Sequence, residues 1–195
     1  MQLFNFIRLA LISSASNTPD ADSALVEACK KELPYAITAY EELVRKYEPT
    51  VLNTCRYLLS DLEDSEEASQ DVFIRVFRHL KKFDQKSTFR TWLYRIVRNC
   101  CYTRIKQQGK HNILEREYLL NSDLEVSQSD KDDPMSSKMV EALAKLSPED
   151  REIITLRFIS ELSLKEISET IEIQLSATKM RLYRSIASLQ EIFKH

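Results

Sequence analysis

Apolar residues recur at helical spacing in the segment 83–110, around which the rest of the chain is organised. The positions fall at i, i+3, i+4, i+7, i+8 and i+11, and they are Phe89, Trp92, Leu93, Ile96, Val97 and Cys100. This period predicts a helix with one face in a hydrophobic core, and Ser87 is a suitable N-cap for it. Four residues fall outside the apolar stripe and are expected to face solvent: Arg90, Tyr94, Arg95 and Arg98.

The preceding part of the chain shows the same period in three further segments. A first helix is predicted from about Ala21 to the residue before Pro34. A second helix is predicted to start at Pro34, because proline suits the first turn of a helix, and Pro49 within it predicts a kink. A third is expected to start inside the segment 61–71, where acids favour the first turn.

The segment 139–195 predicts a second helical domain. Ser147 begins a helix there, with proline in the next position and acids after it. Ser163 and Glu166 form a capping box for a short helix, and a turn over 172–176 leads into a final basic helix. A short helix, a turn and a basic second helix predict a helix-turn-helix, whose second helix docks in the major groove of DNA.

Between these two parts the composition changes. The segment 111–137 carries seven acids and two bases, a net charge of -5, and its second half is rich in serine and aspartate. Such a composition is typical of a flexible acidic linker, which we place at 111–138. The predicted fold is therefore all-α, with an N-terminal extension (1–21), a first helical domain (22–110), the linker, and a C-terminal helical domain (139–195).

Charge is distributed unevenly along the first domain. Between Val72 and Lys110 there are eleven basic residues and a single acid, Asp84, so the net charge is +10 in a chain whose total is -2. Guanidinium groups bind phosphate and aromatic rings stack on unpaired bases, so this pattern predicts a nucleic-acid surface on the helix within 83–110. The acidic segment 61–71 contains no base, which indicates a different surface on the third helix.

Composition excludes several classes of protein. Gly109 is the only glycine in the chain, which removes phosphate-loop and dinucleotide-binding folds. The four cysteines form no CxxC pair and no histidine lies at ligand spacing, so we expect no metal, no cofactor and a reducing cytoplasm as the location. The apolar segment 3–12 is interrupted by Arg8, which favours a loose extension or short helix over an export signal.

Three segments in order resemble one known family. The segment 92–99 (WLYRIVRN) is similar to the promoter-melting helix of extracytoplasmic-function (ECF) sigma factors of bacterial RNA polymerase, in the sigma-70 family. The segment 66–73 (EEASQDVF) resembles their helix that binds core polymerase, and 146–184 resembles their C-terminal promoter-reading domain. The resemblance implies a transcription initiation factor with no enzymatic activity of its own. It implies that the protein binds core polymerase, promoter DNA and an anti-sigma factor, and that it serves a stress or envelope-response regulon.

The resemblance also implies roles for individual residues. Core-polymerase binding falls on Glu66, Glu67, Gln70, Asp71 and Arg75. Recognition and melting of the minus-10 element fall on Lys82, Phe83, Lys86, Ser87, Thr88, Arg90, Thr91, Trp92, Tyr94, Arg95, Arg98 and Asn99, with Trp92 equally suited to core packing and Asn99 also ambiguous. Minus-35 recognition falls on Ser176, Ala177, Lys179, Met180, Arg181, Tyr183 and Arg184.

The chain departs from the family pattern in the turn of the helix-turn-helix. Glu172 stands where the family usually has a glycine with positive φ, and Gln174 stands where a better N-cap is usual.

A repressor or activator that works without polymerase is an alternative, but it leaves the acidic-to-basic third helix unexplained. A hydrolase is a further alternative, but no nucleophile and base are suitably spaced for one. For the free protein, the charge contrast predicts that the acidic linker lies over the basic helix and competes with DNA.

Overall fold

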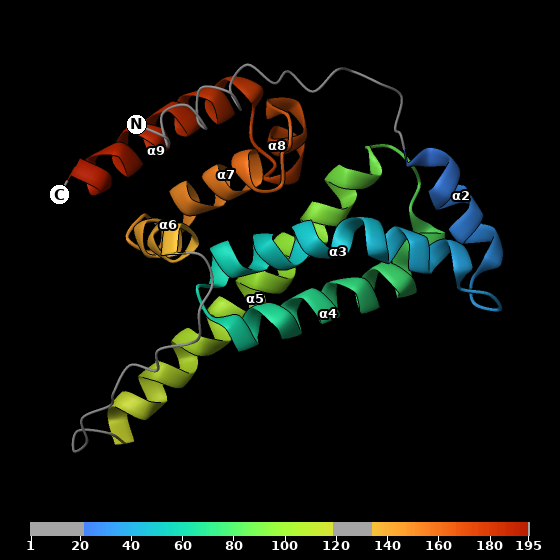
Figure 1. The fold of residues 1–195 in the computed structure, drawn as a ribbon, viewed down its shortest axis with the longest axis horizontal. Helices are drawn as coiled ribbons and strands as arrows, with labels where there is room; N and C mark the ends of the chain where they lie inside the picture. The colour runs from blue at the N-terminus through green and yellow to red at the C-terminus, as the bar shows by residue number, and fades with distance from the viewer. Residues whose placement is uncertain (1–21, 119–133, 195) are drawn as a thin grey trace.

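The computed structural model describes residues 22–118 and 134–194, and every element within these two ranges is a helix (Figure 1). The first range contains α2 (Ser23–Glu32), α3 (Thr38–Leu59), α4 (Leu62–His79), a short 3-10 helix η1 (Leu80–Lys82) and α5 (Phe89–Tyr118). The second contains α6 (Pro134–Ala144), α7 (Pro148–Phe158), α8 (Leu164–Thr170) and α9 (Leu175–Lys194). The all-α prediction is confirmed.

Helices α3, α4 and α5 form the core of the N-terminal domain, with α2 packed on α3. Val51, Val72, Leu93 and Val97 are completely buried between them. The sharp turn from α3 to α4 is closed by Ser60 in the left-handed conformation (φ 62°), after which the Asp61 carboxylate accepts the backbone N–H of Asp64 at 2.8 Å. This cap fixes where the acidic face of α4 begins.

Two predicted helix starts are corrected. Pro34 lies in the turn between α2 and α3, and α3 begins at Thr38 and runs through Pro49 without a break. The N-cap of α5 is Thr88 and not Ser87, because the Thr88 hydroxyl accepts the backbone N–H of Thr91 at 3.2 Å. A hydroxyl at either position could cap the helix, so the sequence pattern alone did not decide between neighbouring residues.

The predicted linker, 111–138, carries helix at both of its ends. Helix α5 continues to Tyr118, and α6 begins at Pro134. The rest of the linker prediction, 119–133, lies outside the described residues, as does the N-terminal extension 1–21. Within the described ranges, no helix is both long and apolar enough to cross a membrane.

The C-terminal domain follows the predicted capping signals. The Ser147 hydroxyl accepts the N–H of Asp150 at 3.1 Å and starts α7. Ser163 and Glu166 form the capping box of α8, with reciprocal bonds of 3.2 and 2.9 Å. The turn between α8 and α9 places Glu172 at φ 59°, so a non-glycine residue takes the left-handed conformation that glycine usually supplies.

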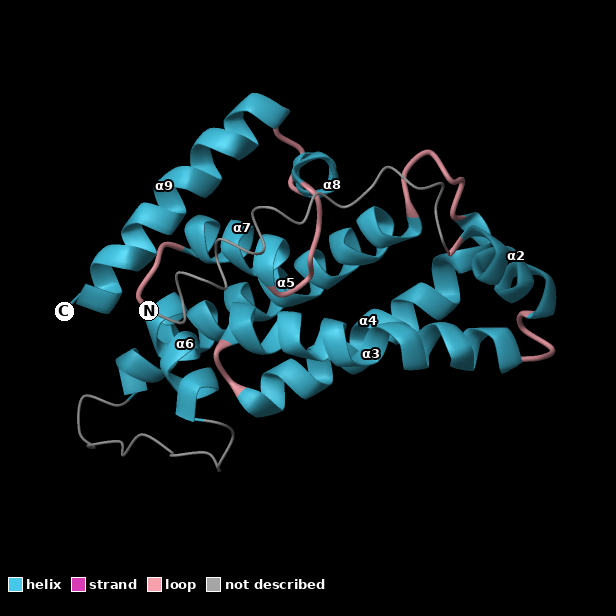
Figure 2. Cartoon of the chain, turned by 45° about the horizontal axis from the view of Figure 1, so that its top comes forward, coloured by secondary structure: helices cyan, strands magenta, loops and turns pink. Residues whose placement is uncertain are grey.

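The two domains pack against each other. Helix α3 contacts α6 and α7, and α5 contacts α8, so the C-terminal domain covers one side of the N-terminal bundle (Figures 1 and 2). At the centre of the contact, the hydroxyls of Thr54 in α3 and Ser160 after α7 are 2.9 Å apart, and both residues are fully buried. The structure therefore describes a closed arrangement of the two domains.

Candidate nucleic-acid interface

The arginines of α5 that were expected to face solvent point at the C-terminal domain instead. Arg90 donates from Nη2 to the backbone carbonyl of Ser160 at 2.7 Å. Arg95 donates from Nε and Nη2 to the carbonyl of Glu169, at 3.1 and 2.7 Å. The expectation of outward-facing arginines is thus corrected: all three predicted arginines, Arg98 included, are half-buried beneath the second domain.

The third contact is an ion pair between Arg98 and Glu152 of α7. Arg98 donates from Nε to Glu152 Oε1 at 2.6 Å, and the hydroxyl of Tyr102 donates to Glu152 Oε2 at 3.2 Å. Glu152 is only 2% exposed, and burial raises the pKa of its carboxyl despite the opposing effect of Arg98. Removing a carboxylate from water costs free energy, so the buried Glu152 needs both hydrogen-bond donors from α5. Its contacts therefore hold the two domains together.

The aromatic residues around the arginines are packing residues in this arrangement. Tyr94 is 1% exposed, and burial raises its pKa to about 12, so the prediction that it faces outward is wrong. Phe83 and Thr91 are also buried. Trp92 is half-buried, with its ring centroid 5.0 Å from that of Phe83 and 5.8 Å from that of Phe89, which agrees with the core-packing alternative. The buried rings of Phe83 and Tyr94 cannot stack on a base in this arrangement.

The loop before α5 supplies the accessible part of the predicted minus-10 set. Lys82, Lys86 and Asn99 are exposed, whereas Ser87 and Thr88 are half-buried. Lys86 pairs with Asp84 at 2.7 Å, and the Thr88 hydroxyl donates to the Glu166 carboxylate at 3.4 Å. The exposed side chains of Lys82, Lys86 and Asn99 thus lie at the rim of the surface that the second domain covers.

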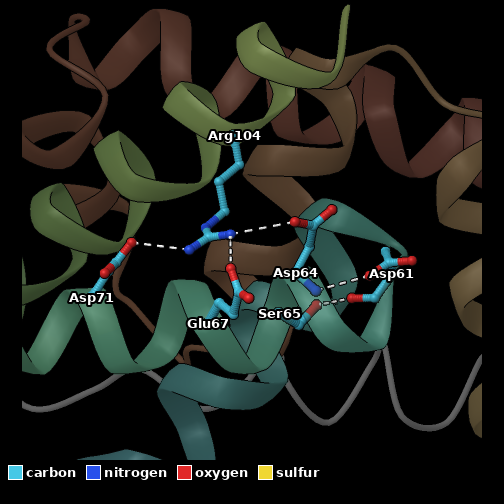
Figure 3. Close-up of polar contacts among 6 residues, drawn as sticks. All are labelled: Asp61, Asp64, Ser65, Glu67, Asp71 and Arg104. Atoms are coloured by element: carbon cyan, nitrogen blue, oxygen red, sulfur yellow. Dashed lines mark hydrogen bonds and ion pairs between the residues drawn. The ribbon is translucent and has the colours of Figure 1, made fainter. Parts of the chain in front are cut away.

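The acids of α4 form a second surface. The predicted polymerase-binding residues Glu66, Glu67, Gln70 and Arg75 are exposed, and the side chain of Asp71 is 48% exposed. Figure 3 shows that Arg104 reaches across from α5 to three carboxylates of α4. Its guanidinium lies 3.3 Å from Asp64, 2.8 Å from Glu67 and 3.0 Å from Asp71.

This cluster was missed by the sequence analysis, which counted Arg104 only as part of the basic stretch. A signal was present, because Asp64, Glu67 and Asp71 follow one another at spacings of three and four and therefore share one face of a helix. Three carboxylates on one face repel one another unless a cation lies between them. Arg104 holds these side chains in place while leaving Glu67 and Asp71 accessible to solvent.

The last helix, α9, presents its first turns to solvent. Met180 and Tyr183 are 74% and 62% exposed, and Lys179 and Arg184 are exposed beside them. Most of the predicted minus-35 set therefore lies on the surface; the exposed members are Ser176, Ala177, Lys179, Met180, Tyr183 and Arg184, and Arg181 is half-buried. An exposed helix face with two full cations and a ring suits contact with the groove and phosphates of a duplex.

The four cysteines are all buried and reduced. The sulfur atoms of Cys55 and Cys101 are 3.7 Å apart between α3 and α5, and burial raises the pKa of the Cys29 and Cys100 thiols to about 11. Among residues 22–118 and 134–194, no group of histidine, cysteine, aspartate and glutamate side chains could hold a metal ion. These cysteines behave as small packing residues.

Two family models match the chain on either side of the predicted linker. Sigma-70 region 2 matches residues 43–111, and Sigma-70, region 4 matches residues 136–189. The chain is 29% identical over 169 residues to the ECF RNA polymerase sigma factor SigW of Bacillus subtilis, a match that covers 78% of this chain and 88% of SigW. It is 30% identical over 165 residues to the ECF RNA polymerase sigma factor SigE of Mycolicibacterium smegmatis, covering 82% of this chain and 64% of SigE.

Solved structures show the same fold. CnrH in complex with the cytosolic domain of CnrY superposes with a TM-score of 0.69 at 21% identity, covering 90% of this chain and 98% of CnrH. The sigma factor RpoE of Bartonella quintana, solved with the anti-sigma factor NepR, gives a TM-score of 0.66 at 21% identity, covering 80% of this chain and 96% of RpoE.

Proposed function

Because the chain belongs to the ECF sigma factors of the sigma-70 family, and is therefore a transcription initiation factor, we propose that it carries core RNA polymerase to promoters with a minus-10 and a minus-35 element. In this proposal the N-terminal domain, 22–110, binds polymerase and assists strand opening. The C-terminal domain, 139–195, reads the minus-35 duplex. The regulon is one for stress or envelope response, and an anti-sigma factor is a further partner.

One observation carries the proposal: two cationic surfaces of different character lie on different domains, and an acidic surface lies apart from both. The α5 arginines are aligned on a helix above a loop with exposed Lys82 and Lys86, which suits the phosphates of a single strand. The exposed face of α9 suits a duplex groove. A repressor that acts without polymerase would need only the second of these surfaces.

The proposed polymerase contact is the acidic face of α4. Glu67 and Asp71 are held by Arg104 with their outer oxygens accessible, so the face is already ordered before a basic partner binds. A partner with cationic side chains at helical spacing would complement it. Preordered carboxylates lose little side-chain entropy on binding, which favours a specific contact over a diffuse electrostatic one.

In vitro transcription with core polymerase, followed by mapping of the start sites, tests the proposal directly. Addition of the protein should direct initiation to specific start sites that core polymerase alone does not use. Gel filtration with core polymerase gives the complementary readout, because co-elution is expected here and not for a repressor that works alone. If the protein neither co-elutes with core polymerase nor changes its start sites, the proposal is wrong.

The polymerase contact is best tested with neutral variants. Lysines in place of Glu67 and Asp71 would put new cations beside Arg104 and disturb the fold, so the double variant Glu67→Gln, Asp71→Asn is preferable. It should weaken binding to core polymerase by at least about tenfold, since two charged hydrogen bonds are lost. Glu63→Gln, which removes one exposed acid near the start of the same helix, is the matched control.

The duplex contact has its own test. Arg184→Ala, combined with Lys179→Ala, should weaken binding of the holoenzyme to an intact promoter while sparing a promoter already opened by mismatches, as followed by permanganate footprinting. Both side chains are exposed on α9, so truncation leaves the fold intact. Equal losses on duplex and pre-opened templates would contradict the assignment of α9 to the duplex.

A further inference from the structure

The arginines proposed to hold the DNA strand are the same ones that the C-terminal domain occupies. Resting on the function proposed above, we propose that the C-terminal domain and a DNA strand compete for one face of α5. In the closed protein, oxygens of the C-terminal domain bind Arg90, Arg95 and Arg98 where phosphate oxygens would bind in the open one. The strand-binding surface is therefore already filled by the protein's own second domain.

The chemistry of the occupying groups supports this substitution. Ser160 follows the C-terminal end of α7, and Glu169 lies in the last turn of α8. The Glu169 carbonyl therefore belongs to the C-terminal end of a helix, where carbonyls lack an intrahelical partner and carry the negative end of the helix dipole. The Ser160 carbonyl, just beyond α7, carries the ordinary partial negative charge of a peptide group. Two partial negative charges and the full charge of Glu152 thus face three guanidinium groups, which is the kind of ligand that a phosphate backbone also offers.

The geometry leaves no room for both ligands. Arg95 directs two of its nitrogen atoms at the single Glu169 carbonyl, at 3.1 and 2.7 Å. The contact is closed on the α3 side by the buried hydroxyls of Thr54 and Ser160. It is extended further by Arg151, whose Nη1 donates to the Leu58 carbonyl at 3.2 Å. A DNA strand can reach these arginines only after α7 and α8 have moved away from α5.

The expectation from the sequence was that the acidic linker shields the basic helix. Residues 119–133 lie outside the described part of the chain, whereas the described occupant of the basic surface is the C-terminal domain. In this proposal the competing group is a folded domain held by directed hydrogen bonds. The apparent affinity of the free protein for a strand falls by the fraction of molecules that are open.

A reversible lock across the contact tests the competition. Thr54→Cys combined with Ser160→Cys puts two sulfur atoms where hydroxyls now lie 2.9 Å apart. Oxidised glutathione should join them, as followed by intact mass and peptide mapping, and dithiothreitol should release them. The probe is a fluorescein-labelled oligothymidylate, because contacts between arginine and phosphate do not depend on base sequence.

The locked protein should bind the oligothymidylate at least about tenfold more weakly than the same protein after reduction, since the open fraction is removed. The variants that carry only Thr54→Cys or only Ser160→Cys, taken through the same oxidation and reduction, should show no such change. Equal binding by the locked and reduced forms would overturn the proposal. Failure of the bond to form would also overturn it, because the closed arrangement places these two side chains in contact.

A second variant opens the contact without touching α5. Glu152→Lys places a cation against Arg98 and should raise the affinity of the free protein for oligothymidylate about fivefold or more. Glu149→Lys makes the same charge change at an exposed position of the same helix, and should raise it by less than about twofold. Equal gains in the two variants would overturn the proposal, because they would show a general charge effect.

The outcomes separate this proposal from the proposed function. If the lock leaves strand binding unchanged but the reduced protein still directs start sites with core polymerase, the competition is wrong and the function stands. If no form of the protein binds the strand while transcription remains specific, the assignment of α5 to the strand fails, and the competition fails with it. If transcription is not directed at all, the proposed function itself is wrong.

Discussion

Arg104 offers the clearest energetic test of how the N-terminal domain is held together. One guanidinium from α5 serves three carboxylates of α4, at 3.3 Å for Asp64, 2.8 Å for Glu67 and 3.0 Å for Asp71 (Figure 3). Replacing it with methionine keeps the length of the stem and much of its packing. The substitution removes the cation that these three contacts share and leaves three acids on one face of α4.

The expected loss follows from the exposure of each pair. The side chain of Arg104 is 16% exposed, whereas those of Asp64, Glu67 and Asp71 are 27%, 58% and 48% exposed. Exposed ion pairs contribute about 0.5 kcal/mol each, and the more buried contact with Asp64 about 1 kcal/mol. The free energy of unfolding should therefore fall by about 2 kcal/mol. For a chain of this size that corresponds to a decrease in Tm of about 4–8 °C.

Urea unfolding at low and high salt measures this loss. Salt screens the exposed pairs, so the difference between wild type and Arg104→Met should shrink at about 1 M NaCl. A double-mutant cycle with Asp64→Asn isolates the most buried of the three contacts. Lys106→Met, an exposed cation two residues further along α5, is the control and should cost less than about 0.5 kcal/mol. A loss for Arg104→Met no larger than that of the control, or one unchanged by salt, would refute the reasoning.

Three further predictions concern stability. Glu172→Gly should raise the free energy of unfolding by about 0.5 kcal/mol. Glycine relieves the strain of the left-handed conformation at φ 59°, and this gain exceeds the greater entropy of glycine in the unfolded chain. A lower free energy of unfolding in urea would contradict this. Thr155→Val should raise the free energy of unfolding by about 1 kcal/mol, since the buried hydroxyl has no hydrogen-bond partner among the described residues. Thr178→Val should lower it, because the Thr178 hydroxyl donates to the Gln174 carbonyl at 3.1 Å. Burial raises the pKa of Cys29 and Cys100 to about 11 from an ordinary value of 9.0. The unfolded chain therefore releases these protons first, and stability should fall by at least about 2 kcal/mol between pH 8 and pH 10.5; a flat profile in urea titrations would show that the thiols do not contribute.

Local signals in the sequence predicted the helices well. Examples are the capping box of Ser163 and Glu166, the Ser147 start of α7 and the apolar stripe from Phe89 to Cys100. Each of these signals is formed by residues that are close together in the sequence, so local geometry decides it. The positions they missed were also local. A hydroxyl at Ser87 and another at Thr88 could each cap α5, and only the packed structure selects the second.

The relation between the domains was not predictable in the same way. Tyr94 falls off the apolar stripe of α5 and would be exposed on an isolated domain, but α3 and the segment after α7 bury it. Burial between domains depends on a second surface whose position no periodicity in α5 can encode. The charge pattern predicted that the acidic linker would lie over the basic surface, and residues 119–133 of that linker lie outside the described part of the chain. The described contacts to the α5 arginines come from Ser160, Glu169 and Glu152 of the C-terminal domain, which the charge pattern did not indicate.

Two of the three contacts to the α5 arginines are made by main-chain carbonyls, and this has a consequence for how mutations at the two sides would be tolerated. A backbone carbonyl is present whatever side chain stands at positions 160 and 169. These two contacts therefore depend on where α7 and α8 end and not on the side chains there. In a saturation mutagenesis screen, position 169 should accept most residues that keep α8 helical, while position 95 should accept few. Substitutions on the C-terminal-domain side of the interface would therefore have little effect, with Glu152 as the exception, whereas substitutions of the α5 arginines would have large effects.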